Sequence, residues 1–289
     1  MLYPIVMTSL IRERKEGPLH APKRLIVHGD DFGLCASVNS ATVAALESGA
    51  LSSASIMVPC AGFREAAAFA AHHPKYDIGI HLTITNEWPR YDWGPVAPQQ
   101  LVSSLTDPRG RFLSTVGEVS RKAKPNEVEI ELCAQIELAM SAGILPTHID
   151  THMFALLDNP RLYCVYANVA QKFNLPFVVL RDSRYPASEV NTVDPVVHTI
   201  FIAYPTLAPA RWEAAYTRTL ELLDNGVSQI IVHVGYDNAE LRNNIGIYSA
   251  FGSVWRERDF NVIRSSQFRE TLQKQQIKLT SWSSAAAKR

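Results

Sequence analysis

Short apolar runs alternate along the chain with longer segments in which apolar residues recur every three or four positions. The short runs predict buried strands, and the periodic segments predict amphipathic helices. The expected strands are residues 24–29, 54–58, 77–83, 147–153, 177–181, 229–234 and 277–282, and the expected helices are 38–48, 63–72, 126–141, 160–173, 208–225 and 266–275. This alternation favours a parallel α/β architecture over a β-sandwich or a helical bundle.

Two segments stand outside the alternation. Residues 1–22 begin with a mildly apolar stretch that charged residues follow, which is the reverse of a secretory signal, and we expect a flexible or loosely docked extension. Residues 86–111 form a long insertion rich in Pro, Trp and Tyr, and loops of this length are usually functional or disordered. Because the chain has no internal repeat, we predict a single domain over residues 23–289 that follows the extension.

Composition narrows the class of protein. The chain has 289 residues, of which 47% are hydrophobic and 19% charged, and barrels of alternating strands and helices reach this size as one domain. The formal net charge is zero, so nothing suggests electrostatic binding to nucleic acid or to an anionic membrane. No apolar run is long enough to cross a membrane. The four cysteines form no CxxC pair, and we therefore expect reduced thiols in a cytoplasmic enzyme rather than a thiolate zinc cluster.

Histidine and aspartate gather at the ends of the expected strands. In a barrel of parallel strands, the active site lies at the carboxyl ends of the strands and in the loops that follow them. Side chains alternate along a strand, so the three ionisable residues of the strand at 147–153 share one face. The clusters are Asp30 with Asp31, then His81, then His148 with Asp150 and His152, and finally His233.

These clusters suit a divalent metal ion. Imidazole nitrogens and a carboxylate are typical ligands of zinc, manganese or iron, and such an ion lowers the pKa of a bound water to about 7 in favourable zinc sites. A second carboxylate beside the first could act as a base toward that water. Taken singly, an aspartate pair after a strand is often a turn or a helix cap, and a lone histidine is more often structural. Burying three ionisable groups on one face of a strand costs folding free energy unless a metal ion binds them or they pair with one another.

Three motifs resemble those of one family. Residues 24–34 read RLIVHGDDFGL, residues 79–83 read GIHLT and residues 146–152 read PTHIDTH. In this order they resemble the motifs of the YdjC-like carbohydrate deacetylases, a family that includes chito-oligosaccharide deacetylases and a hopanoid-associated branch. The likeness in motif order extends over roughly residues 24–282, which is nearly the whole chain.

The resemblance implies a (β/α) barrel-like fold and one divalent metal ion per chain, either magnesium, zinc or manganese. It also assigns roles to residues that match the motifs. The metal ligands would be Asp31, His81 and His152, the general base toward the metal's water would be Asp30, and the general acid that protonates the leaving amine would be His233.

Four further residues are candidates for supporting roles. His148 and Asp150 would lie behind the metal ligands or face the substrate. Arg181, at the end of an expected strand, would hold an aspartate or a substrate oxygen, or form a structural salt bridge. Trp88 and the other aromatic residues of the insertion would stack on a sugar ring or cover the site, or pack on the barrel or on a partner subunit.

The activity that the resemblance implies is metal-dependent removal of an acetyl group from a small N-acetylated sugar or oligosaccharide, and a homodimer is compatible with it. Two departures from the family pattern leave the substrate open. Met153-Phe154-Ala155 stands where chito-oligosaccharide members continue with further histidines, and the residues around His233 differ from the family's segment. A metal-dependent amidase or esterase for a non-sugar substrate would use the same residues, whereas a non-catalytic carbohydrate-binding relative should lose the base or a ligand.

Overall fold

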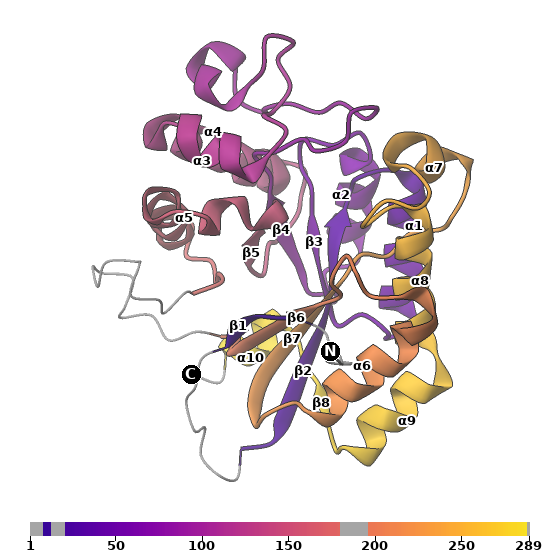
Figure 1. Ribbon diagram of the computed structural model, residues 1–289. Coiled ribbons are helices and arrows are strands. Elements are labelled where there is room, and N and C mark those ends of the chain that lie inside the picture. The colour runs from indigo at the N-terminus through magenta and orange to yellow at the C-terminus, as the bar shows by residue number, and fades with distance from the viewer. Residues whose placement is uncertain (1–7, 13–20, 180–195, 288–289) are drawn as a thin grey trace.

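The computed structural model describes residues 8–12, 21–179 and 196–287, and its centre is a curled sheet flanked by helices (Figure 1). Six parallel strands follow one another in the order β6-β7-β2-β3-β4-β5. Their bounds are β2 (Lys23–Phe32), β3 (Ser53–Ile56), β4 (Ile78–Leu82), β5 (Ile149–Thr151), β6 (Thr199–Ile202) and β7 (Gly226–Val232). β1 (Thr8–Arg12) pairs antiparallel with β6, and β8 (Lys278–Leu279) lies parallel to the start of β2. The expected α/β barrel-like fold is confirmed, in the form of an open half-barrel.

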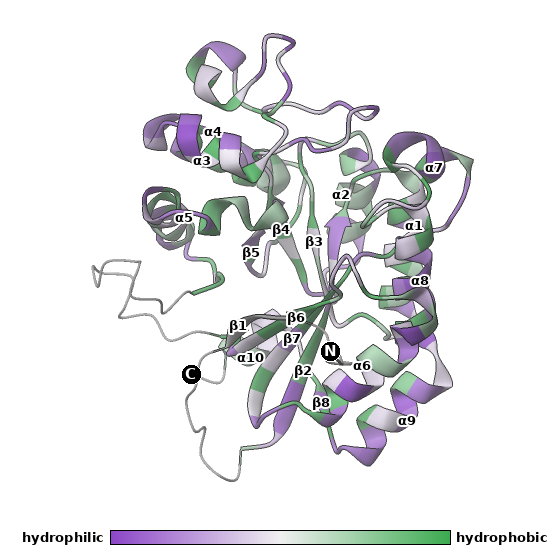
Figure 2. Ribbon diagram, in the orientation of Figure 1, coloured by the Kyte–Doolittle hydropathy of each residue, from purple (hydrophilic) through white to green (hydrophobic). Residues whose placement is uncertain are grey.

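Helices connect the strands and cover the sheet. They are α1 (Ala36–Glu47), α2 (Phe63–His72), α3 (Val116–Lys122), α4 (Pro125–Ser141), α5 (Pro160–Lys172), α6 (Trp212–Glu221), α7 (Ala239–Ile245), α8 (Ser253–Arg264), α9 (Ser266–Lys274) and α10 (Trp282–Ala286). Short 3-10 turns are η1 (Gln99–Leu101), η2 (Ser103–Leu105), η3 (His152–Leu157) and η5 (Pro209–Arg211). The strands are largely hydrophobic, whereas the helices carry polar residues on part of their surface (Figure 2). None of the described helices is long and apolar enough to cross a membrane.

Several elements differ from the sequence-based prediction. The apolar pattern does not predict β1, β6, α3, α7 or α8. The segment 277–282, expected as a strand, pairs only at β8 and then enters α10, because the Ser281 hydroxyl caps this helix by accepting the backbone N–H of Ser284 (3.2 Å). A strand was also expected at 177–181. Among its described residues, 177–179, Phe177 forms an isolated bridge to Ile149.

The insertion over residues 86–111 packs against the barrel. Trp93 is buried, and its Nε1 donates a hydrogen bond to the carbonyl of Thr85 (2.7 Å). The Glu131 carboxylate on α4 accepts the backbone N–H groups of Val96 (3.0 Å) and Ala97 (2.9 Å). These contacts hold the insertion beside the carboxyl ends of the strands.

Candidate active site

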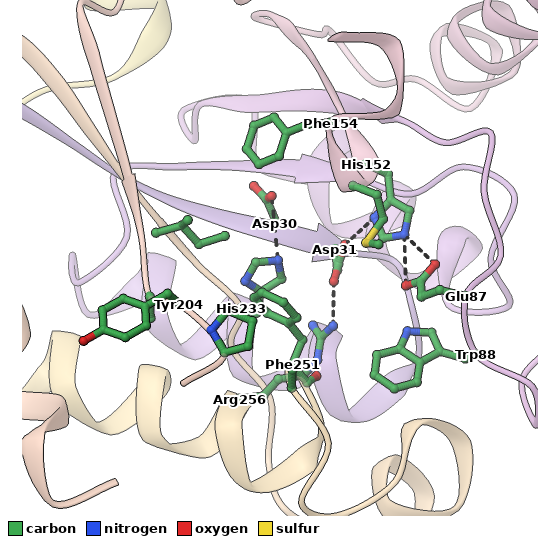
Figure 3. Close-up of a pocket in the computed structure, with 15 residues that line it drawn as sticks. Asp30, Asp31, Glu87, Trp88, His152, Phe154, Tyr204, His233, Phe251 and Arg256 are labelled. Atoms are coloured by element: carbon green, nitrogen blue, oxygen red, sulfur yellow. Dashed lines mark hydrogen bonds and ion pairs between the residues drawn. The ribbon is translucent and has the colours of Figure 1, made fainter. Parts of the chain in front are cut away.

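A cavity of about 540 Å³ lies at the carboxyl ends of the parallel strands (Figure 3). Charged and imidazole side chains converge on it from several elements, and the remaining walls are mostly apolar. Its polar lining consists mainly of Asp30, Asp31, Glu87, His152, His233 and Arg256. Its apolar lining includes Trp88, Met153, Phe154, Ile202, Pro205 and Phe251.

Three predicted metal ligands meet at the edge of this cavity. Asp31 is the next-to-last residue of β2, His81 lies in β4, and His152 follows β5 at the start of η3. Nδ1 of His152 lies 3.2 Å from Oδ1 of Asp31 and 3.3 Å from Nε2 of His81, and the last two atoms are 3.4 Å apart. Metal–ligand bonds of 2.0–2.1 Å in a tetrahedral zinc site separate ligand atoms by roughly 3.3 Å. The buried Oδ1 of Asp31 accepts no hydrogen bond from the described residues, so the three atoms fit a divalent cation.

The remaining nitrogens of both histidines are held by carboxylates. Nδ1 of His81 donates to Oδ1 of Asp150 (2.8 Å), and Nε2 of His152 donates to Glu87 (3.0 Å to Oε2). A histidine that donates one N–H to a carboxylate presents the lone pair of its other nitrogen. Nε2 of His81 and Nδ1 of His152 are therefore the nitrogens that can bind a metal.

The second oxygen of Asp31 is held by Arg256, which reaches it from α8. Nη2 of Arg256 lies 2.6 Å from Oδ2 of Asp31, and both side chains are buried. Burial alone raises the pKa of Asp31, but the Arg256 cation and the neighbouring imidazoles outweigh burial and hold the pKa well below its usual range. Asp31 is therefore ionised at neutral pH.

Asp150 supports the site from beneath. Besides His81, its carboxylate accepts Nε2–H of His28 (2.9 Å) and the hydroxyl of Ser55 (2.9 Å). Burial raises the pKa of Asp150, but the two imidazoles reverse this and hold the pKa below its usual range. The ionised carboxylate orients His81 without lining the cavity itself.

Asp30 lines the cavity directly beside the three ligand atoms. Its Oδ1 lies 3.3 Å from Nε2 of His28, and its Oδ2 lies 3.8 Å from Nε2 of His81 and 3.9 Å from Nε2 of His233. Burial raises the pKa of the Asp30 carboxyl to about 6. A carboxylate with a pKa in this range can take up a proton near neutral pH.

His233 follows β7 and lines the cavity next to Asp30 (Figure 3). Its backbone N–H donates to Oδ2 of Asp259 on α8 (3.0 Å). Burial lowers the pKa of the His233 imidazole to about 3. The ring is consequently neutral at the pH of a cell.

Three further residues were predicted from the sequence to support the site, namely His148, Trp88 and Arg181. His148 is fully buried below the cavity, where its ring stacks on Trp282 (centroids 4.9 Å apart, 8° between planes). Trp88 lines the cavity, and Arg181 lies outside the described residues. The sequence-based prediction missed His28, Glu87 and Arg256. Glu87 could have been noticed as the first carboxylate after the strand of His81, whereas no local pattern singles out Arg256.

Backbone strain concentrates around the cavity. Four non-glycine residues that line it have a positive φ, namely Asp31 (65°), Met153 (55°), Phe154 (53°) and Phe251 (59°). This conformation is unfavourable for residues with a side chain, and it tends to persist at functional sites where the surrounding structure imposes it. The strain is an independent sign that this cavity is the functional site.

Known proteins are similar to this chain in sequence, and one solved structure is similar to it in fold. A carbohydrate deacetylase of Brevibacillus brevis is 29% identical over 266 residues, which cover 90% of this chain and 98% of that protein. A carbohydrate deacetylase of Geobacillus stearothermophilus is 34% identical over 163 residues, which cover 56% of this chain and 62% of that protein, less than two thirds. A solved structure from Enterococcus faecalis V583, described as a candidate cellobiose-phosphate cleavage protein, is 25% identical with a TM-score of 0.75, over 91% of this chain and 98% of that one.

A family model described as YdjC-like protein matches residues 24–274. This range contains the described residues that line the cavity, from Asp30 to Arg256. The chain therefore belongs to the YdjC-like protein family.

Proposed function

We propose that this chain removes the acetyl group of an N-acetylated carbohydrate by metal-dependent hydrolysis. The observation that carries the proposal is the convergence of Asp31 Oδ1, His81 Nε2 and His152 Nδ1 within 3.2–3.4 Å of one another, beside the carboxylate of Asp30. The relatives named carbohydrate deacetylases support the choice of substrate class.

Asp31, His81 and His152 would hold the metal ion, either magnesium, zinc or manganese. When bound, a divalent cation lowers the pKa of water and polarises the acyl carbonyl. Asp31, with Oδ2 paired to Arg256, offers one oxygen, and each histidine offers one nitrogen. Magnesium prefers oxygen ligands, so two imidazoles favour zinc or manganese.

The chain's own residues move the protons. Asp30 accepts a proton from water as the water oxygen bonds to the acyl carbon. When the carbon–nitrogen bond breaks, the leaving nitrogen takes up a proton, and the products are acetate and the free amino sugar. The neutral His233 must receive a proton before it donates one, and Asp30 lies 3.9 Å from its Nε2. We assign His233 as the group that passes the proton from Asp30 to the leaving nitrogen.

The apolar walls of the cavity suit the remainder of the substrate. Trp88 and Phe154 line it from two elements that follow neighbouring strands. Aromatic rings present flat apolar faces, and the C–H faces of a sugar ring are also apolar. Removing the ring of Trp88 should therefore raise KM more than it lowers kcat.

Metal analysis together with acetate release tests the proposal. We expect about one metal ion per chain, and release of acetate from N-acetylated mono- and oligosaccharides that a chelator abolishes. Asp30→Asn should lower kcat by about 10²–10⁴-fold with the metal retained, whereas His81→Ala should lose both metal and activity.

Each other outcome changes the assignment. Bound metal with hydrolysis of only non-sugar amides or esters would identify a different metal-dependent hydrolase. A folded chain that binds no metal after reconstitution would overturn the mechanism and favour a carbohydrate-binding role. Near-normal turnover by Asp30→Asn would show that Asp30 is not the base.

A further inference from the structure

Helix α8 holds two residues of the candidate site, Asp31 through Arg256 and His233 through Asp259. Arg256 and Asp259 are three positions apart, so they project from one face of the helix. Both side chains are buried, each with 1% of its surface exposed. Charged residues are almost never buried to this degree unless they are paired, and both residues have several hydrogen-bond partners.

Arg256 is anchored at two points. Its Nε donates to the carbonyl of Phe251 (2.8 Å), and its Nη2 donates to Oδ2 of Asp31 (2.6 Å). The first contact fixes the guanidinium against the chain entering α8, and the second occupies one oxygen of Asp31. Only Oδ1 of Asp31 is left to face His81 and His152.

Asp259 is the centre of a second set of contacts. Its Oδ1 accepts Nε1–H of Trp212 (2.8 Å) and the hydroxyl of Tyr216 (2.6 Å), both on α6. Its Oδ2 accepts Nε1–H of Trp255 (3.2 Å) and the backbone N–H of His233 (3.0 Å). The three side-chain donors hold the carboxylate rigidly, and the carboxylate in turn holds the backbone of His233.

We propose that α8 positions two functional groups at once: Arg256 restricts Asp31 to a single metal-binding oxygen, and Asp259 keeps His233 opposite Asp30. This inference rests on the proposed function, because it assigns Asp31 as a metal ligand and His233 as a proton carrier. Neither residue of α8 is placed as a catalytic group. Each is a positioning residue that acts through the neighbour it holds.

Cobalt(II) binding tests the role of Arg256 without any substrate. The visible absorbance of bound cobalt depends on the number and arrangement of its ligand atoms, as expected from the coordination preferences of transition metals. In Arg256→Gln, the released Oδ2 of Asp31 can also bind, and we expect lower visible absorbance per bound cobalt. Arg256→Lys keeps a cation that can reach Oδ2, and its spectrum should return toward that of the wild type.

The matched control is Arg264→Gln, an exposed arginine on the same helix that lies over Phe260. Its cobalt spectrum should equal that of the wild type. An unchanged spectrum in Arg256→Gln would overturn the role of Arg256, and so would a Lys variant that is as altered as the Gln variant. If the wild type itself binds no cobalt, the result contradicts the proposed metal-dependent function. That outcome is distinguishable from a failure of the role assigned to Arg256, in which the wild type binds cobalt normally.

Asp259 is tested by kinetics combined with the same spectrum. Asp259→Asn and the charge-retaining Asp259→Glu should lower kcat at least about tenfold with KM nearly unchanged, because they displace His233, and their cobalt spectra should match the wild type. Circular dichroism checks that each variant is folded. If Asp259→Asn does not fold, the kinetic test is made with Asp259→Glu alone. Unchanged kcat, or a cobalt spectrum altered as in Arg256→Gln, would overturn the separate role of Asp259.

Discussion

The two ring nitrogens of His152 have different partners. Nδ1 faces Asp31 and His81, whereas Nε2 lies 3.0 Å from Oε2 of Glu87. A carboxylate in this position fixes the tautomer and the orientation of the ring, and it makes the opposite nitrogen a stronger ligand. Glu87 thus determines how well His152 can bind a metal.

Substitutions at Glu87 should therefore weaken metal binding. In Glu87→Gln the amide oxygen can still accept Nε2–H but the charge is lost, and we expect roughly tenfold weaker binding; Glu87→Ala should approach about 100-fold. Calorimetric titration of the metal-free protein measures the change. Glu118→Gln, on the surface of α3, is the control. If Glu87→Ala bound the metal as tightly as the wild type, Glu87 would have no role in supporting His152.

The strand-end residues of the cavity could be predicted from the sequence, but their partners could not. Each aspartate or histidine of the proposed reaction lies within the last three residues of a strand or directly follows one, and the ends of parallel strands converge whatever the details of packing. Glu87, in contrast, lies 65 residues from His152, and Arg256 lies 225 residues from Asp31. Which side chain faces which across such distances depends on how the loops and helices pack, and no local pattern encodes this.

At the level of elements, α2 and α8 show why one helix is predictable and another is not. The helix predicted at residues 63–72 coincides with α2, whose buried residues are apolar or aromatic (Phe63, Ala66, Ala67 and Ala70). The buried face of α8 includes Arg256 and Asp259. A periodic pattern can be recognised only where the buried stripe is apolar, so the charges that give α8 its proposed role also conceal it in the sequence.

The approach of β4 to β5 depends on Gly79. A Cβ at this position would lie 2.6 Å from the backbone oxygen and the ring of His148. We expect Gly79→Ala to destabilise the protein by roughly 1–3 kcal/mol, because backbone atoms must shift, and to disturb His81 two residues later. Urea unfolding and metal titration measure the two effects.

Gly117 on α3 offers the comparison, since a Cβ there meets only the end of the Arg121 side chain at 3.4 Å. Gly117→Ala should stabilise the helix by up to about 1 kcal/mol. If Gly79→Ala were as stable as the wild type, the close packing of β4 on β5 would not be required.

For the whole molecule, buried histidines couple stability to pH. Burial lowers the pKa of His148 to about 4, although the Asp77 carboxylate opposes this. In the unfolded chain a histidine takes up a proton near pH 6.5. Between these two values the unfolded state binds more protons than the folded state, so stability falls as the pH falls from 6.5 toward 4.

His148→Gln should remove this part of the pH dependence. The shift from 6.5 to about 4 corresponds to about 3.5 kcal/mol at most, since one pKa unit is worth about 1.4 kcal/mol. Unfolding free energies of the two proteins, measured in urea from pH 7 to 4.5, should therefore converge at acidic pH even if the variant is less stable at pH 7. Parallel curves over this range would show that His148 does not couple folding to pH.

Strand β1 brings the first described residues of the chain to the lateral border of the open sheet, where Thr8 pairs with Ile202 and Arg12 with Thr199. Without it, β6 would offer unpaired N–H and C=O groups to any strand of another molecule. Such a border invites edge-to-edge aggregation, and here it would lie next to Ile202 and Ala203 in the cavity wall. β1 thereby moves the open border from the cavity wall to a strand of five residues whose register is irregular between Ser9 and Ile11, and short, irregular edge strands pair poorly with other molecules. A chain without β1 should therefore aggregate more readily than the full chain, as measured by light scattering.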